Sequence, residues 1–127
     1  MAKRLAKNFN CATEFTLQVL GGKWKTVILC FLSLGPLRYT ELRKFMPNLS
    51  DKVLSQRLHE LAEAGLIEHR KSARGDKPEI YALAARAKSL ARVLTELYSW
   101  GETNAAEFGV TVGHPLRSTD GLPGRRT

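Results

Sequence analysis

The chain has 127 residues, of which 43% are hydrophobic, and this combination fits a single compact domain with a core of its own. Its formal net charge of +8 favours a polyanionic partner, with nucleic acid ahead of a membrane surface. No apolar run reaches the roughly 18 residues of a membrane span, and two cysteines suit neither a zinc site nor a disulfide framework, so we expect a cytoplasmic protein without a cofactor.

The first third of the chain predicts a basic arm followed by two helices. Residues 1–10 are polar and basic, which is typical of an N-terminal arm. A helix is expected from Cys11 to Leu20, because its apolar side chains follow helical spacing and Gly21-Gly22 ends it. The segment from Lys23 to Leu34 is apolar nearly all round, so we expect it to form the central helix of the core.

The next segment has the pattern of a helix-turn-helix. A minimal strand is expected near Arg38, and a short helix begins at Thr40 and cannot continue past Pro47. After a short polar turn, Ser50 is suited to cap a second helix that extends to Ala64, and Asp51 favours the positive end of that helix. A short turn between two such helices is the layout of a DNA-reading motif.

The second of these helices has two distinct faces. One carries leucines at helical spacing, and the other is polar and comprises Lys52, Ser55, Gln56, His59 and Glu63. A solvated surface is the simpler interpretation of a polar face. The preceding turn, and the hydrogen-bonding groups toward the N-terminal end of the helix, favour contact with base edges in the major groove.

A basic hairpin follows the second helix. Residues 66–70 and 79–83 read as antiparallel strands, with Gly75 near the tip between them. The cations of this hairpin are Arg70, Lys71, Arg74 and Lys77. They could simply keep the sheet edge from pairing with another chain. Beside a helix-turn-helix they are better explained as a wing that contacts phosphates or enters the minor groove. The predicted fold is therefore mostly α with a small β-hairpin wing (α+β), a winged helix-turn-helix.

The C-terminal third predicts one long amphipathic helix and a tail. Apolar side chains follow helical spacing from Ala84 to about Glu107, over a length of roughly 36 Å. A small domain cannot cover a stripe of that length, so we expect part of it to pack on a second subunit. Residues 111–127 are rich in Gly, Pro, Arg, Ser and Thr, which predicts a flexible basic tail.

Four motifs occur in order along the chain. They are Cys11 followed nine residues later by Leu20-Gly-Gly-Lys-Trp24, then Gly35-Pro-Leu-Arg-Tyr-Thr-Glu-Leu42, Leu49-Ser-Asp-Lys-Val-Leu-Ser-Gln-Arg-Leu58 and Leu61-Ala-Glu-Ala-Gly-Leu66. Together they resemble the HxlR family of bacterial transcriptional regulators, and the likeness extends to about Gly101. The wing and Ala12, which stands where the family usually has proline, depart from the pattern.

The resemblance implies a homodimeric, DNA-binding winged-helix protein that is distantly related to MarR regulators. The family domain would span residues 11–110 and would dimerise through its N- and C-terminal helices. It would bind a pseudo-palindromic operator and act as a repressor or an activator. Several members respond to electrophiles or oxidants through the cysteine that Cys11 matches, which implies redox sensing here.

Several residues are candidates for contact with duplex DNA. Lys52, Ser55, Gln56 and His59 would approach base edges, and Gln56 can pair bidentately with adenine. The amide groups at Ser50–Lys52, Asp51 included, would hold a phosphate at the helix N-terminus, and Arg38 and Thr40 could do the same for the preceding helix. Arg57 lies on the flank, where bracing Glu60 or Glu41 is as good an interpretation as DNA contact.

Two further alternatives stay open. Cys11 is either a small apolar residue that opens a helix or a sensor thiol whose thiolate Lys7 favours. The same fold could also serve as a protein-protein interaction module whose polar helix face never meets DNA. Paired carboxylates, a phosphate loop and a nucleophile–base signature are all lacking, so we expect no enzyme.

Overall fold

The computed structural model describes residues 7–70, 79–113 and 115. The elements in chain order are α1 (Ala12–Leu20), α2 (Lys23–Leu32), β1 (Leu37–Arg38), α3 (Tyr39–Phe45), α4 (Asp51–Glu63), β2 (Ile67–Arg70), β3 (Ile80–Leu83), the 3-10 helix η1 (Ala85–Leu90), α5 (Ala91–Asn104) and the 3-10 helix η2 (Ala105–Phe108). The fold is mostly α with a small sheet, as the sequence predicts. Most of the expected arm and tail, and the hairpin residues 71–78, lie outside the described residues.

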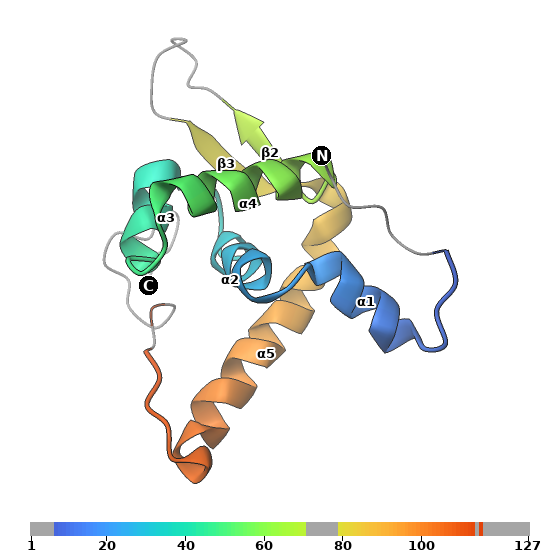
Figure 1. Cartoon of the computed structure of the whole chain (residues 1–127), viewed down its shortest axis with the longest axis vertical. Helices are drawn as coiled ribbons and strands as arrows, with labels where there is room; N and C mark the ends of the chain where they lie inside the picture. The colour runs from blue at the N-terminus through green and yellow to red at the C-terminus, as the bar shows by residue number, and fades with distance from the viewer. Residues whose placement is uncertain (1–6, 71–78, 114, 116–127) are drawn as a thin grey trace.

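Helix α2 lies at the centre of the structure, with α4 and α5 packed around it (Figure 1). Its Ile28 and Leu29 are fully buried, and Leu32 is 2% exposed. Leu54 of α4 and Leu94 of α5 are also fully buried in the same core. This confirms the prediction that the helix without a polar face forms the middle of the core.

The sheet has three antiparallel strands in the order β1-β3-β2. Leu37 pairs with Tyr81 in one ladder, and Ile67 with Leu83 in the other. The predicted minimal strand near Arg38 thus forms the third strand beside the hairpin. Because β3 lies in the middle, the sheet ties the start of α3 to the hairpin that follows α4.

The helix-turn-helix differs from the prediction in one detail. Helix α3 begins at Tyr39, and Arg38, not Thr40, occupies its N-cap position. The backbone N–H of Arg38 donates to Oε1 of Glu41 at 2.8 Å, so the carboxylate of a residue inside the first turn bonds the N–H of the N-cap residue. At α4 the predicted cap is confirmed, since Oγ of Ser50 accepts from the Val53 N–H at 3.1 Å.

The predicted long C-terminal helix is interrupted. Its first turns form η1 and its last turn forms η2, with α5 between them. Ala84 offers no side-chain acceptor, and the N–H of Ala87 bonds to the Ala84 carbonyl at 2.9 Å, which is 3-10 geometry. A helix end without a polar cap commonly satisfies its backbone groups in this way.

Helix α1 and the C-terminal part of α5 extend away from the remaining elements in different directions (Figure 1). Gly21 and Gly22 adopt φ values of 79° and 95°, which other residues rarely adopt, and they turn the chain between α1 and α2. No single described helix is long and apolar enough to cross a membrane. The α1–α2 pair passes that test jointly, by length and composition, but is bent by 81°.

Candidate nucleic-acid interface

Helix α4 presents its polar face at the surface of the chain. Leu54, Leu58 and Leu61 are buried, whereas Lys52, Ser55, Gln56 and His59 are exposed. Nε2 of His59 lies 3.3 Å from Oε2 of Glu63, one turn further along the same face. The structure therefore brings these four predicted residues together on one exposed face, beyond the cap of Ser50.

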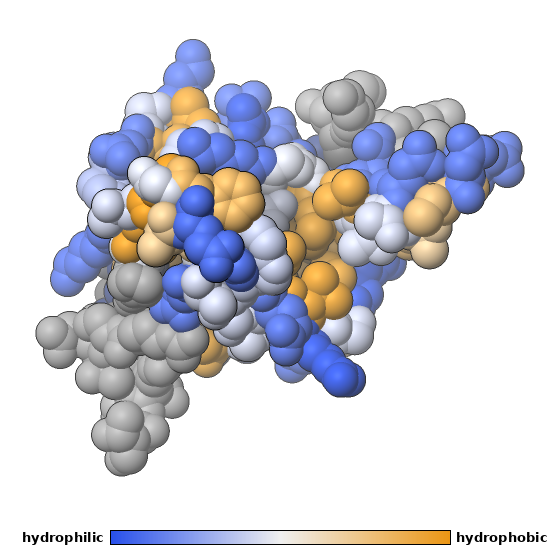
Figure 2. Space-filling view, turned by 90° about the horizontal axis from the view of Figure 1, so that it is seen from below, coloured by the Kyte–Doolittle hydropathy of each residue, from blue (hydrophilic) through white to orange (hydrophobic). Residues whose placement is uncertain are grey.

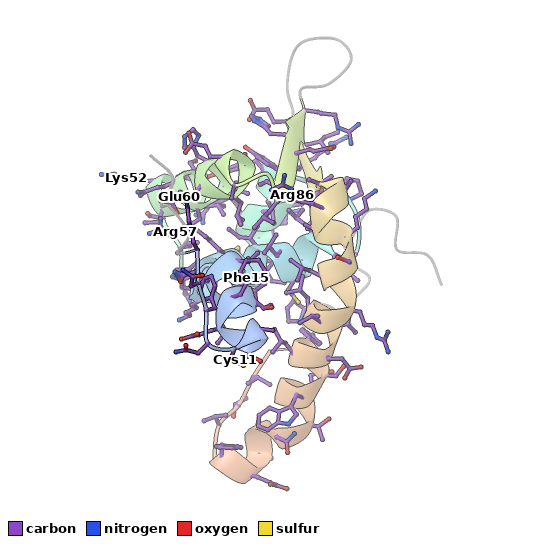
Figure 3. All side chains as sticks on the ribbon, turned by 90° about the vertical axis from the view of Figure 1, so that its right-hand side faces the viewer. Cys11, Phe15, Lys52, Arg57, Glu60 and Arg86 are labelled. Atoms are coloured by element: carbon purple, nitrogen blue, oxygen red, sulfur yellow. The ribbon has the colours of Figure 1, made fainter. Side chains whose placement is uncertain are left out.

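Arg57 points to a different side of α4. Its Nη1 lies 3.0 Å from Oε1 of Glu60, and Nζ of Lys25 in α2 reaches the same oxygen at 3.1 Å. Burial opposes ionisation of Glu60, but hydrogen bonds and charge from Lys25 and Arg57 outweigh it, so its pKa is lowered. Arg57 thus takes the bracing role with Glu60, and Lys25 is a partner that the sequence did not suggest. Figure 3 labels these α4 side chains.

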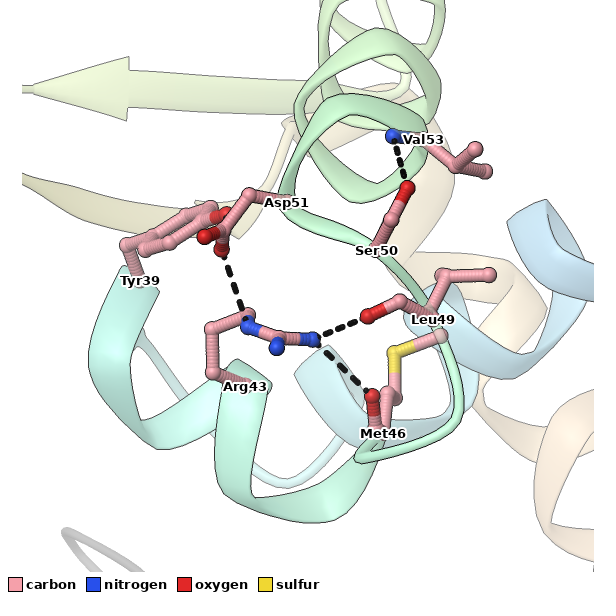
Figure 4. Close-up of polar contacts among 7 residues, drawn as sticks. All are labelled: Tyr39, Arg43, Met46, Leu49, Ser50, Asp51 and Val53. Atoms are coloured by element: carbon pink, nitrogen blue, oxygen red, sulfur yellow. Dashed lines mark hydrogen bonds and ion pairs between the residues drawn. The ribbon is translucent and has the colours of Figure 1, made fainter.

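A second arginine, Arg43, joins α3, the turn and α4 (Figure 4). Its Nη1 donates to the carbonyl oxygens of Met46, at 3.2 Å, and Leu49 in the turn. Its Nε lies 3.0 Å from Oδ1 of Asp51, at the start of α4. We call these contacts the Arg43 clamp. The sequence signal was a cation in the last turn of a helix, where it can bond free carbonyls.

Asp51 also accepts a hydrogen bond from Tyr39. The hydroxyl of Tyr39 donates to Oδ1 of Asp51 at 2.7 Å, and burial together with this carboxylate raises the pKa of Tyr39. The contact places the first turn of α3 beside the first turn of α4. Arg38 and Thr40, which flank Tyr39, are exposed.

Side chains of β2 and β3, together with Glu79 just before β3, hold the two strands together next to residues 71–78. The ring of His69 stacks on Tyr81 with centroids 4.6 Å apart, and its Nε2 lies 2.9 Å from Oε1 of Glu79. Burial, followed by the charge of Glu79, raises the pKa of Tyr81 to about 12. Arg70 is exposed at the end of β2. The other predicted wing cations, Lys71, Arg74 and Lys77, lie outside the described residues.

Cys11 lies exposed at the N-cap of α1. The backbone and hydroxyl of Thr13 and the backbone of Glu14, at the start of α1, lower the pKa of its thiol. The helix start supplies this effect, whereas the sequence had pointed to Lys7. Cys30 of α2 is half-buried, and burial raises the pKa of its thiol.

The family model described as HxlR-like helix-turn-helix matches residues 19–108 of this chain. The chain belongs to the HxlR family. It is 42% identical, over 96 residues, to an HTH-type transcriptional regulator, YkvN, of Bacillus subtilis (strain 168), and the match covers 75% of this chain and 80% of that protein.

Solved structures show the same relationship. The crystal structure of the HTH-type transcriptional regulator ytcD matches with a TM-score of 0.65 and 38% identity, over 76% of this chain and 98% of that one. The redox regulator HypR in its oxidized form matches with a TM-score of 0.68 and 30% identity, over 74% of this chain and 97% of that one. This HxlR protein is therefore a transcriptional regulator with a winged helix-turn-helix fold, and its relatives are regulators, not enzymes.

The Arg43 clamp predicts that Arg43→Gln lowers the free energy of unfolding by about 1–3 kcal/mol, because the Leu49 carbonyl loses its side-chain donor and Asp51 loses its ion pair. Urea denaturation at a fixed protein concentration measures the change. Lys44→Gln, at the exposed neighbouring cation, should shift it by no more than about 0.5 kcal/mol. Equal midpoints for the two variants would show that the clamp does not stabilise the helix-turn-helix.

The lowered pKa of Cys11 predicts alkylation at a lower pH than a free cysteine requires, because the thiolate is the nucleophile. The measurement is the rate of iodoacetamide modification against pH, in a Cys30→Ala background. Thr13→Val should move the midpoint of this profile upward, since it removes one donor. Thr16→Val, a change of the same kind within α1, should leave it in place. A midpoint equal to that of a cysteine peptide contradicts the assignment.

Proposed function

We propose that this HxlR regulator binds a pseudo-palindromic DNA operator as a homodimer, with α4 of each protomer in a major groove. The observation that carries the proposal is the exposed polar face of α4, whose N-terminal end the Arg43 clamp ties to α3. The two α4 helices would enter successive grooves about 34 Å apart on one side of the duplex. Repressor and activator roles are both compatible with this arrangement.

Each exposed residue of the interface has a role in this proposal. Gln56 reads a base, Lys52 contacts a guanine or a phosphate, and Ser55 and His59 make further base contacts. The amide groups at the start of α4 hold a phosphate, and Arg38 and Thr40 do the same at the start of α3. Arg70 and the wing cations Lys71, Arg74 and Lys77 add phosphate contacts. Residues 1–10 and 111–127 serve as basic extensions of the 11–110 domain.

The homodimer would form through α1 and α5. Large apolar side chains are exposed on these helices and on the segment after them, namely Phe15, Leu17, Val93, Leu97, Trp100, Phe108, Val110 and Val112. Seen from below, hydrophobic surface gathers in the angle between α5 and α1 (Figure 2). Large apolar side chains exposed together on one side of a chain are typical of a protein interface. Burying it in a twofold contact would fix the spacing of the α4 helices.

Cys11 gives the proposed dimer a redox or electrophile response. The thiol is exposed, its pKa is lowered, and it opens α1. Oxidation or alkylation there would add bulk or charge at the proposed interface and change the spacing of the two α4 helices. The likeness to HypR, a redox regulator, supports this role. We place the protein in the bacterial cytoplasm, on DNA.

Fluorescence anisotropy with an operator selected in vitro tests the DNA contacts. Gln56→Ala should weaken operator binding by about 1–3 kcal/mol and leave generic duplex unaffected, because it removes a base contact. If Lys52 contacts a phosphate, Lys52→Ala should reduce the slope of log K against log salt by about 0.9. Lys88→Ala, at an exposed cation of η1, is the control and should change neither value.

Two results would count against DNA binding through α4. One is a protein that fails to bind any duplex at low salt, which would favour the protein-protein interaction module. The other is unchanged operator affinity in both Gln56→Ala and Lys52→Ala, which would move the interface away from α4.

Sedimentation velocity tests the dimer. Leu97→Glu should yield a folded monomer, because it puts a charge into the proposed dimer contact. The Leu97 side chain is 52% exposed in the single chain, so the monomer should tolerate the change. Leu17→Glu on α1, where the side chain is 62% exposed, should do the same. Thr95→Glu, at an exposed position on another side of α5, should remain dimeric. Dimers in all three variants would exclude α1 and α5 as the interface.

A further inference from the structure

The carboxylate of Asp51 uses one of its two oxygens inside the protein. Tyr39 donates its hydroxyl to Oδ1 at 2.7 Å, and Nε of Arg43 lies 3.0 Å from the same oxygen. Figure 4 shows Asp51 between these two side chains of α3. Within residues 7–70 and 79–113, Oδ2 has neither a hydrogen bond nor an ion pair, and the Asp51 side chain is 76% exposed.

The two donors fix the direction of this carboxylate. Tyr39 begins α3 and Arg43 lies in its last turn, so rotation of the Asp51 side chain would break contacts to both ends of that helix. Burial, followed by the contact with Asp51, raises the pKa of Tyr39, so its hydroxyl keeps its proton and stays a donor at neutral pH. Oδ2 is therefore oriented before a partner arrives, which lowers the entropic cost of a further hydrogen bond.

Asp51 begins a polar stripe along α4. Ser55 and His59 follow it at intervals of four residues, so the three side chains lie on one side of the helix. All three are exposed. The proposed function puts Ser55 and His59 against base edges, and the N-terminal residues of a recognition helix are the ones that contact bases. The same placement brings the Asp51 carboxylate to the major groove.

An oriented carboxylate restricts which base can lie opposite it. It carries a negative charge and only accepts hydrogen bonds, so the acceptor edges of guanine and thymine repel it. In the major groove only the amino groups of adenine and cytosine donate. The adenine amino group lies between two acceptors, its own N7 and thymine O4, whereas the cytosine amino group has an acceptor, guanine O6, on one side only. Cytosine is therefore the base that suits Asp51 best.

We propose that Asp51 is a specificity-determining residue, and that its Oδ2 accepts a hydrogen bond from the N4 amino group of a cytosine in each half of the operator. Tyr39 and Arg43 act on this base through Asp51, as positioning residues. The inference rests on the proposed function and adds to it the identity of one base that α4 reads. Any other base at this place leaves a desolvated charge without a donor, so the half-site binds more weakly.

A structural role of Asp51 is separable from this one. The ion pair with Arg43 and the position at the positive end of α4 both stabilise the fold. Those contributions are independent of DNA sequence, so on their own they predict equal weakening of all duplexes when Asp51 is changed. Reading a base predicts a loss of preference at one base pair of each half-site.

In vitro selection of operators by the full-length protein and by Asp51→Asn compares their base preferences. The unaltered protein should select a C·G pair at one symmetric position of each half-site. Asp51→Asn should accept other base pairs there, because the amide offers a donor as well as an acceptor. Glu107→Gln makes the same charge change in η2, at the opposite end of the molecule from α4 (Figure 1), and should select the same operator as the unaltered protein.

An operator that lacks only the amino group tests the hydrogen bond itself. Replacing the selected cytosine by 2-pyrimidinone removes N4 and should weaken binding to the unaltered protein by about tenfold in fluorescence anisotropy. The loss should be smaller in Asp51→Asn, and the difference between the two proteins separates the contact from any change in the duplex. Tyr39→Phe removes one positioning donor and keeps the Arg43 ion pair, so its loss should lie between the other two.

The outcomes separate this inference from the proposed function. Selection of the same operator by the unaltered protein and Asp51→Asn would overturn the reading role alone, and so would equal losses on the pyrimidinone operator. A protein that binds no duplex would refute the proposed function, and the reading role with it. Circular dichroism melts check that the variants fold. If Asp51→Asn does not fold, Tyr39→Phe decides, and a loss equal to that of the unaltered protein would overturn the inference.

Discussion

The orientation of α4 depends on a cation at the end of α3. Pro47 ends α3. In the turn that follows, the guanidinium of Arg43 donates to the carbonyl of Leu49 and to that of Met46, which also accepts from the Leu49 N–H. The same guanidinium holds Asp51, which Tyr39 contacts from the start of α3. Both ends of α3 are thereby tied to the first turn of α4. Core leucines fix the rotation of α4 about its axis, and these polar contacts fix its position along α3.

Local signals made the central part of the fold predictable. The cap of Ser50 and the spacing of Leu54 and Leu58 depend on residues within one or two turns, so the sequence displays them directly. The partners of long side chains are different. Arg43 has many rotamers, and its partners up to Asp51 become neighbours only after the turn has formed. Lys25 meets Glu60 across two helices, and periodicity carries no signal for such a pair.

The C-terminal region marks another limit of sequence reasoning. Helical spacing correctly predicted a long amphipathic segment, because the apolar stripe persists from Ala87 to Leu97. It could not predict the change from η1 to α5, since that change depends on how uncapped backbone groups near Ala84 find partners. The apolar stripe also does not show which of its side chains are buried within one chain and which stay exposed. Leu94 is fully buried, whereas Leu97, three residues later, is 52% exposed.

The net charge of the chain overstates the positive charge that can face DNA. Arg43 is held by Asp51 and two carbonyls, and Lys25 and Arg57 share Glu60. These three cations act within the protein, whereas Lys52 is exposed on α4. Counterion release counts only cations that neutralise phosphates. Under the proposed function, the salt dependence of DNA binding should therefore reflect Lys52, the α3 start and the hairpin more than the total charge of +8.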